Sequence, residues 1–218
     1  MSDALLAGAS GLVGAELARA WAGPGTLHLL VRRPGPEPAP GRIVHVVDFA
    51  ALPALPPAHS AFCCLGTTIK VAGSQAAFRA VDFDAVLAFA RAARAAGVQR
   101  FALVSALGAN ARSPNFYSRV KGEAEAALRG IGFASLVIAR PSMLVGDRAA
   151  IGQPVRRGER IAFALSRPLG PLIPRAWRPI EAASVARALL RATAQARPGV
   201  RVIGSAELQS LGRAASKP

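Results

Sequence analysis

The chain has 218 residues, a length that suits one domain with a sizeable buried core. It is 52% hydrophobic, but Arg140 and Pro141 interrupt its longest apolar stretch, and a transmembrane helix needs about 20 apolar residues in a row. The formal net charge of +15 suggests phosphate-bearing partners. The arginines are spread one or two at a time and lack interleaved aromatic residues, so we expect no specific nucleic acid and no membrane as partner. The N-terminus shows no signal-peptide pattern, which makes a cytoplasmic location the default expectation.

Short apolar runs alternate along the chain with longer segments of helical periodicity. Continuously apolar runs are typical of strands that are covered on both faces, as in a parallel sheet. The pattern predicts an α/β fold with a Rossmann-type, doubly wound and mainly parallel sheet of about seven strands. The expected strands span residues 4–7, 27–31, 43–47, 61–65, 101–105, 134–139 and 200–203.

Three segments have the clearest helical patterns: residues 75–96, 115–129 and 183–194. In the first, apolar residues recur at three- and four-residue steps, namely Phe78, Val81, Ala85, Phe89 and Ala92. Gly97 stands where a helix C-cap is expected.

Two segments break the alternation. The proline-rich residues 34–41 predict a loop after the second strand. Residues 146–180 predict a small irregular cap on the substrate side, above the carboxyl ends of the strands. We therefore expect residues 1–218 to form a single Rossmann domain, with residues 211–218 as a frayed tail.

The first strand leads directly into the glycine-rich turn GASGLVG at residues 8–14, and an amphipathic helix follows. Gly8 permits a tight turn, Gly11 lets the backbone approach a pyrophosphate, and Gly14 lets the helix pack close to the strand. The helix N-terminus would then face the phosphates of a dinucleotide. The spacing is one residue longer than in the common GxGxxG pattern, so the prediction depends on the strand before it and the helix after it.

The residues after the second strand indicate which dinucleotide binds. An acidic residue about 20 positions beyond the glycines usually binds the ribose 2′-hydroxyl of NAD. Arg32 and Arg33 stand there instead, and guanidinium groups suit a 2′-phosphate, so NADP is favoured over NAD unless both belong to the surplus of surface arginine. Asp48, after the third strand, is placed either to touch the adenine edge or to cap a helix.

Tyr117, the only tyrosine, and Lys121 lie four residues apart on a predicted helix and therefore share one face. Ser105 ends the fifth strand, at the sheet edge where a nicotinamide ring would lie. Carbonyl reduction needs a proton donor, and a tyrosine with a pKa near 10 needs a nearby cation to serve as one. We expect Tyr117 to donate the proton, Lys121 to stabilise the phenolate and Ser105 to bind the substrate oxygen. Otherwise Ser105 is a strand-end cap and Tyr117 a surface aromatic.

No metal site is expected. Cys63 and Cys64 are adjacent in an apolar run, where a mutual disulfide would be strained, so they predict buried thiols. His28, His45 and His59 are scattered along the sequence.

With these motifs the chain resembles the atypical short-chain dehydrogenase/reductase family, and within it the branch of Tat-interacting-protein-like NAD(P)-binding oxidoreductases. The resemblance is carried by GASGLVG at 8–14, CCLGTT at 63–68, VSALGAN at 104–110, YSRVKGEAE at 117–125 and RPSMLVGDR at 140–148. It implies Ser105, Tyr117 and Lys121 as catalytic residues. It also implies cofactor contacts from Gly8, Ser10, Gly11, Leu12, Val13, Gly14, Arg32, Arg33, Asp48, Leu65, Gly66, Thr67, Lys121 and Pro141.

The fourth-strand motif Cys-Leu-Gly-Thr lacks the asparagine of ordinary short-chain reductases, so no asparagine relay is assumed. We expect an NADPH-dependent oxidoreductase of a small carbonyl substrate. The alternative is a non-catalytic NADP(H)-sensing regulator or scaffold, and the family's homodimers suggest association through the helices that carry Phe83 and Tyr117. The cap would line an apolar pocket, in which Arg156, Arg157 and Arg160 are either anion anchors or solvated surface.

Overall fold

The computed structural model describes residues 3–35, 38–146 and 174–213. Its centre is a seven-stranded sheet in the order β3-β2-β1-β4-β5-β6-β9. All neighbouring strands in this sheet run parallel, which confirms the predicted Rossmann-type arrangement. The strands are β1 (Ala4–Ala7), β2 (Leu27–Val31), β3 (Arg42–Val46), β4 (Ser60–Cys63), β5 (Arg100–Val104), β6 (Ser135–Arg140) and β9 (Gly199–Gly204).

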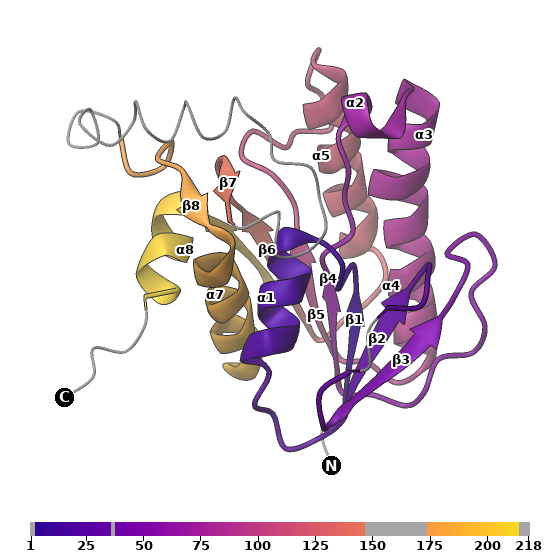
Figure 1. The fold of residues 1–218 in the computed structure, drawn as a ribbon. Helices are drawn as coiled ribbons and strands as arrows, with labels where there is room; N and C mark the ends of the chain where they lie inside the picture. The colour runs from indigo at the N-terminus through magenta and orange to yellow at the C-terminus, as the bar shows by residue number, and fades with distance from the viewer. Residues whose placement is uncertain (1–2, 36–37, 147–173, 214–218) are drawn as a thin grey trace.

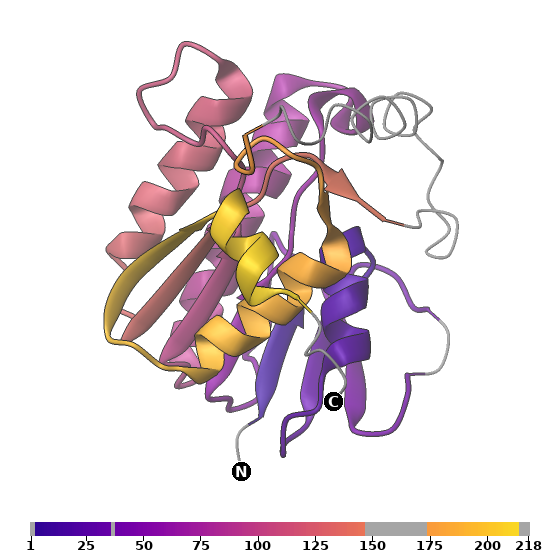
Figure 2. The same cartoon turned by 90° about the vertical axis from the view of Figure 1, so that its left-hand side faces the viewer.

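Helices cover both faces of this sheet (Figures 1 and 2). One face packs against α1 (Leu12–Ala20), α7 (Ala182–Ala194) and α8 (Ser205–Leu211). The other packs against α4 (Ala85–Ala95) and α5 (Phe116–Arg129). Because strand side chains alternate between faces, β1 sends Leu6 into the first layer of core and Leu5 into the second. The two cores meet only through the sheet, so the strands are apolar on both faces.

The long helix that the sequence predicts at residues 75–96 is a continuous helical segment with a change of pitch. It consists of α3 (Gln75–Arg79), the π-helical turn η1 (Ala80–Asp84) and α4. A π-turn holds more residues than an α-turn, so it shifts the buried positions along the sequence. The predicted stripe is therefore right at Phe78 and Phe89, which are fully buried, and wrong at Val81, Ala85 and Ala92, because their neighbours Asp82, Val86 and Ala93 are buried instead.

The other predicted helices are found at almost the predicted residues. The Asn115 side chain accepts a hydrogen bond from the Ser118 N–H and caps α5. Gly97, at φ +91°, follows α4 where the C-cap was expected. Within the described ranges, none of the helices has both the length and the apolar character that crossing a bilayer requires.

Several elements are not evident in the sequence pattern. The helix α2 (Ile69–Ala72) follows β4, and a two-stranded parallel pair joins β7 (Leu144–Val145) to β8 (Ile180–Glu181). Helix α8 ends at Leu211, where the frayed tail was expected to begin. Most of the predicted cap, residues 147–173 with Arg156, Arg157 and Arg160, lies outside the described residues.

Candidate functional site

The glycine turn lies between β1 and α1, as predicted. The fold itself requires two of its glycines. Gly8 has φ +86°, and a Cβ there would lie 2.5 Å from the carbonyl carbon of Cys64. A Cβ at Gly14 would lie 2.1 Å from the carbonyl oxygen of Gly8. Neither position has room for a side chain, so this turn can pack against the end of β4 and start α1 only with glycine.

Gly11 differs from these two. A Cβ there would make only ordinary contacts, 3.4 Å from the Gly8 oxygen and 3.9 Å from the Cys64 oxygen. The described residues therefore do not need glycine at position 11, whereas a ligand approaching the backbone would. Helix α1 begins there without a side-chain capping bond or an acidic residue in its first turn, so no side-chain carboxylate competes with an anion at its N-terminus.

The loop after β4 joins this turn to the predicted catalytic helix. Gly8 packs against the backbone of Cys64 and Leu65, because a Cβ at Gly8 would lie 2.8 Å from the Leu65 nitrogen as well as 2.5 Å from Cys64. One residue on, a Cβ at Gly66 would lie 3.5 Å from the Nζ atom of Lys121. The Lys121 ammonium is therefore adjacent to the same short loop that closes over the glycine turn, at the carboxyl edge of the sheet.

Lys121 is buried and forms an ion pair with the fully buried Asp82, with 2.7 Å between Nζ and Oδ1. Burial alone would lower the pKa of Lys121, but the Asp82 carboxylate and, to a smaller extent, Tyr117 raise this pKa above the ordinary lysine value. The other Asp82 oxygen, Oδ2, accepts a hydrogen bond of 2.9 Å from the Thr67 N–H. Lys121 is thus held as an ammonium ion beside the 65–67 loop.

Tyr117 lies one helical turn before Lys121 and is half-buried. Its ring packs against Phe78 of α3, with 5.4 Å between ring centroids. It shares one face of α5 with Lys121, four residues later, and it contributes to raising the pKa of that lysine.

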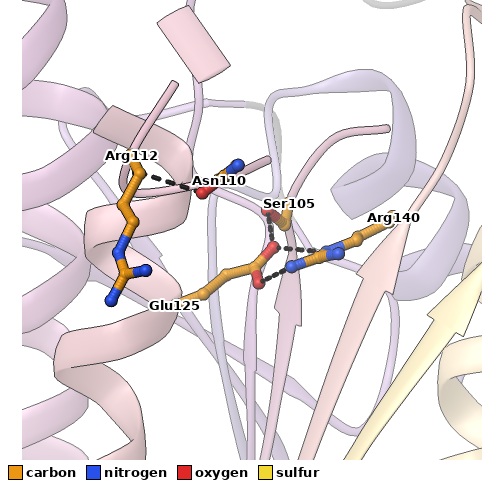
Figure 3. A network of polar contacts seen from close by, with 5 residues as sticks. All are labelled: Ser105, Asn110, Arg112, Glu125 and Arg140. Atoms are coloured by element: carbon orange, nitrogen blue, oxygen red, sulfur yellow. Dashed lines mark hydrogen bonds and ion pairs between the residues drawn. The ribbon is translucent and has the colours of Figure 1, made fainter. Parts of the chain in front are cut away.

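Ser105 is buried, and its hydroxyl belongs to a separate polar network (Figure 3). The hydroxyl donates to Glu125 at 2.5 Å, and Arg140 binds both oxygens of the same carboxylate, at 3.0 and 2.6 Å. A hydroxyl has one proton, so in this arrangement Ser105 cannot also donate to a substrate oxygen. Its predicted substrate contact stays a prediction that requires this hydrogen bond to break. Glu125 and Arg140 also line an open hollow of about 340 Å³ between α5 and the loop after β5.

The remaining predicted cofactor residues lie around the same sheet edge. Arg32 and Arg33 directly follow β2 and are exposed. Asp48 accepts a hydrogen bond of 2.9 Å from the Ala50 N–H, which makes it a turn residue with an exposed side chain. Pro141 is buried after β6, and its carbonyl oxygen accepts from the Leu107 N–H, which links the loops that follow β5 and β6.

The cysteines are free, as predicted, although only Cys63 is fully buried. Burial raises the pKa of the Cys63 thiol to about 12, which makes it a poor nucleophile.

Three residues with buried or paired charges escaped the sequence reasoning: Asp82, Glu125 and Arg140. Asp82 stands four residues after Phe78 and four before Val86, so its place on the apolar stripe was a usable signal. Glu125 stands four residues after Lys121, on the same helix face. Arg140 stood out only as a charge at the end of an apolar run, and the sequence could not show its partner, because Glu125 belongs to another element.

The strand order, the glycine turn after β1 and the Tyr-x-x-x-Lys helix beside it define the class: an atypical short-chain dehydrogenase/reductase fold. Solved structures agree on the fold. MoeE5 in complex with UDP-glucose and NAD superposes with a TM-score of 0.70 at 18% identity, over 97% of this chain and 81% of that one. The UDP-glucuronic acid 4-epimerase from Bacillus cereus in complex with NAD gives a TM-score of 0.66 at 12% identity, over 93% and 77%.

Sequence relatives identify the family within that class. The mitochondrial protein FMP52 of Debaryomyces hansenii is 35% identical over 156 residues, covering 67% of this chain and 68% of that protein. FMP52 of Coccidioides immitis is 32% identical over 167 residues, with 68% of each chain covered. The chain belongs to the HTATIP2/FMP52 family. No family model matches it.

The match to some relatives is shorter. Rat HTATIP2 is 42% identical over 121 residues, which are 54% of this chain and 48% of that protein. For FMP52-1 of Scheffersomyces stipitis the match covers 38% of the relative. The chain thus spans less than half the length of these two relatives.

The expectation of a cytoplasmic location is wrong by this comparison, because the fungal relatives are named as mitochondrial proteins. That expectation depended only on the absence of a recognisable leader pattern, and such an absence does not identify a compartment.

Proposed function

We propose that this chain is an NADPH-dependent reductase of a small carbonyl compound. One observation carries the proposal: the Lys121 ammonium lies against Gly66, in the short loop whose preceding residues, Cys64 and Leu65, pack on Gly8. The candidate proton-transfer pair and the candidate phosphate-binding turn are therefore neighbours at one edge of the sheet. In open parallel sheets this carboxyl edge is where ligands bind.

The described residues fit a dinucleotide. Gly11 leaves space that no side chain of the described residues fills, and α1 begins without an acidic residue in its first turn, so that it offers the positive end of a helix dipole. Gly8 to Gly14 would hold the pyrophosphate, the 65–67 loop and Pro141 would contact the nucleotide halves, and Lys121 would bind ribose hydroxyls. Arg32 and Arg33 are exposed and free of acidic side chains next to them in sequence, which suits a 2′-phosphate.

The chain's own part in the chemistry is proton transfer. A bound nicotinamide supplies hydride to the carbonyl carbon. Tyr117 would give its hydroxyl proton to the carbonyl oxygen, and Lys121 would stabilise the phenolate that remains. Because Asp82 keeps Lys121 protonated, the cation is in place before the proton leaves Tyr117.

The test compares wild type with Tyr117→Phe, which keeps the ring that packs against Phe78. NADPH binding is followed by fluorescence and turnover by NADPH absorbance with a panel of aldehydes and ketones. We expect unchanged NADPH affinity and a fall in turnover of roughly 10²–10⁴-fold, the usual contribution of a general acid. Equal turnover by both proteins would contradict the proposed role of Tyr117, and failure of the wild type to bind NADPH would contradict the proposal as a whole.

A non-catalytic NADP(H) sensor is the second candidate, and the Ser105 contact favours it. The hydroxyl that would orient a substrate oxygen donates instead to Glu125. A sensor would bind NADPH as tightly as the reductase but show no turnover with any carbonyl compound, and Tyr117→Phe would change neither property.

A further inference from the structure

Asp82 connects two parts of the candidate site that come from distant positions in the sequence. Its Oδ1 atom lies 2.7 Å from the Nζ of Lys121, on α5. Its Oδ2 accepts a hydrogen bond from the N–H of Thr67, in the loop after β4. The Asp82 carboxylate is fully buried, and Gly66 lies over the ion pair, with a would-be Cβ 3.3 Å from Oδ1.

The π-helical turn η1 explains how an acid comes to lie here. Asp82 occupies the middle of η1, on a helix whose other buried side chains, such as Phe78 and Val86, are apolar. Single π-turns inside α-helices are frequent at functional sites, because they re-aim side chains at some cost in hydrogen bonding. A buried acid is costly as well unless it is paired, and Asp82 has both a cation and a backbone donor.

The charged and titratable groups that face Lys121 come from three elements. They are Asp82 of η1, Tyr117 of α5 itself and the Cys63 thiol of β4. Of these, only Asp82 carries a carboxyl group, and its Oδ1 lies 2.7 Å from Nζ, so it is the group that can keep a buried ammonium charged. Without it, burial would favour the neutral amine.

We propose that Asp82 is a positioning residue for Lys121, which keeps the lysine protonated and ties the catalytic helix to the 65–67 loop. The inference rests on the proposed function only for its effect on turnover, since the state of Lys121 can be measured without nucleotide or substrate.

The chain has only three lysines, Lys70, Lys121 and Lys217, so NMR of lysine-labelled protein can follow each ammonium group separately. In the wild type, we expect Lys121 to titrate above about 10.4, the value of an unperturbed lysine. In Asp82→Asn, burial is no longer offset, and Lys121 should titrate below this value by one unit or more, on the order expected for buried amines. A wild-type Lys121 that titrates at or below the ordinary value overturns the proposal, and this measurement needs no variant.

Glu123→Gln is the matched control. Glu123 also lies on α5 and pairs with a cation, Arg79 at 2.5 Å, but this pair is partly exposed. Removing the Glu123 charge should leave the Lys121 titration unchanged. If Glu123→Gln lowers the pKa of Lys121 as much as Asp82→Asn does, the shift reflects only the loss of a negative charge from the protein. The specific role of Asp82 is then refuted.

Should Asp82→Asn fail to fold, the double variant Asp82→Asn with Lys121→Met provides the check. Removing both partners leaves no uncompensated buried charge, so the double variant should be more stable to denaturant than Asp82→Asn alone. Equal or lower stability of the double variant would show that the two side chains are not coupled.

Turnover separates this proposal from the proposed function. With an active carbonyl substrate, Asp82→Asn should move the alkaline decline in kcat to lower pH than in the wild type, because Lys121 then loses its proton within the measured range. A purely structural role would lower kcat equally at every pH. Absence of turnover in the wild type would defeat the reductase but leave the NMR result on Asp82 intact.

Discussion

Gly11 and Gly14 stand three residues apart, yet their surroundings differ. A methyl group at Gly14 would overlap the carbonyl oxygen of Gly8, at 2.1 Å, whereas at Gly11 it would meet nothing closer than 3.4 Å. Glycine at position 14 is therefore needed by the protein's own packing, whereas the described residues would accept a larger residue at position 11.

We predict opposite behaviour of the two alanine variants. Gly14→Ala should lower the free energy of unfolding by about 1–3 kcal/mol, the usual cost of overpacking, although alanine is the better helix former. Gly11→Ala should leave stability within about 0.5 kcal/mol of the wild type but weaken NADPH binding at least tenfold. Denaturant unfolding and fluorescence titration check both. A Gly11→Ala protein that binds NADPH normally would remove this turn from the proposed cofactor site.

Glu125 links three elements that carry the site. It lies on α5, accepts from Ser105 beyond the end of β5, and binds Arg140 at the end of β6. The hydrogen bonds of Glu125 raise the pKa of Arg140, so that guanidinium stays charged. The network fixes the helix carrying Tyr117 and Lys121 against the sheet.

We predict that Glu125→Ala lowers the free energy of unfolding by about 3 kcal/mol, the low end for a broken buried pair because Arg140 keeps contact with water. Ser105→Ala should cost about 1 kcal/mol, the value of one hydrogen bond. Denaturant unfolding at neutral pH measures both. If Ser105→Ala instead leaves stability unchanged and abolishes turnover, Ser105 binds substrate, as the sequence predicts, and its contact with Glu125 is secondary.

A histidine pair joins two neighbouring strands on the same side of the sheet as α4. The Nδ1 of His28 on β2 lies 2.9 Å from the Nε2 of His45 on β3, and Asp3 lies 3.7 Å from His28. Burial and the neighbouring His28 lower the pKa of His45, so the folded protein favours its neutral form.

The sign of the pH effect follows from this lowered pKa. As pH falls through about 6.5, His45 takes up protons more readily in the unfolded chain than in the folded one, so stability decreases. Thermal melts at neutral and mildly acidic pH should therefore show that Tm decreases less on acidification in His45→Gln than in the wild type. His59→Gln, which changes an exposed histidine outside the pair, is the control and should match the wild type. An equal loss in all three proteins would exclude His45 as the cause.

The parallel sheet brings the turn after β1, the loop after β4 and the residues after β2 to one edge, so nucleotide binding should stabilise the fold as a unit. At NADPH concentrations about 100 times the Kd, the gain in unfolding free energy should be about 2.7 kcal/mol, visible as a rise in Tm. We predict that replacing Arg32 and Arg33 together by alanine reduces this gain for NADPH but not for NADH, since only NADPH carries the 2′-phosphate.

Added salt should likewise reduce the NADPH effect more than the NADH effect, because exposed charges are screened. Arg32 and Arg33 are exposed, so their replacement should cost the fold little stability. Without nucleotide, the variant should have the same Tm as the wild type. Equal stabilisation by NADPH and NADH in the wild type would contradict the preference for NADP.

Much of this architecture follows from local patterns in the sequence. The apolar runs of the central strands β1, β4, β5 and β6 are largely buried, whereas the edge strands β3 and β9 keep exposed residues such as Val46 and Val200. A run such as residues 101–105 needs no distant information to be recognised. The spacing of Gly8, Gly11 and Gly14 and of Tyr117 and Lys121 also lies within single turns or helices, so it predicts both halves of the candidate site. The NADP preference inferred from Arg32 and Arg33 remains a prediction.

Contacts between elements were decided only by the tertiary structure. A π-turn moved burial from Val81 and Ala85 to Asp82 and Val86, and it placed Asp82 against a lysine 39 positions later in the chain. Arg140 likewise pairs with Glu125, and the Ser105 hydroxyl donates its hydrogen bond to that carboxylate rather than to a ligand. Periodicity describes which face a residue occupies within its own element. The partner of a buried charge is set by how the elements pack, because a charge removed from water is stable only where another part of the chain supplies its counter-charge.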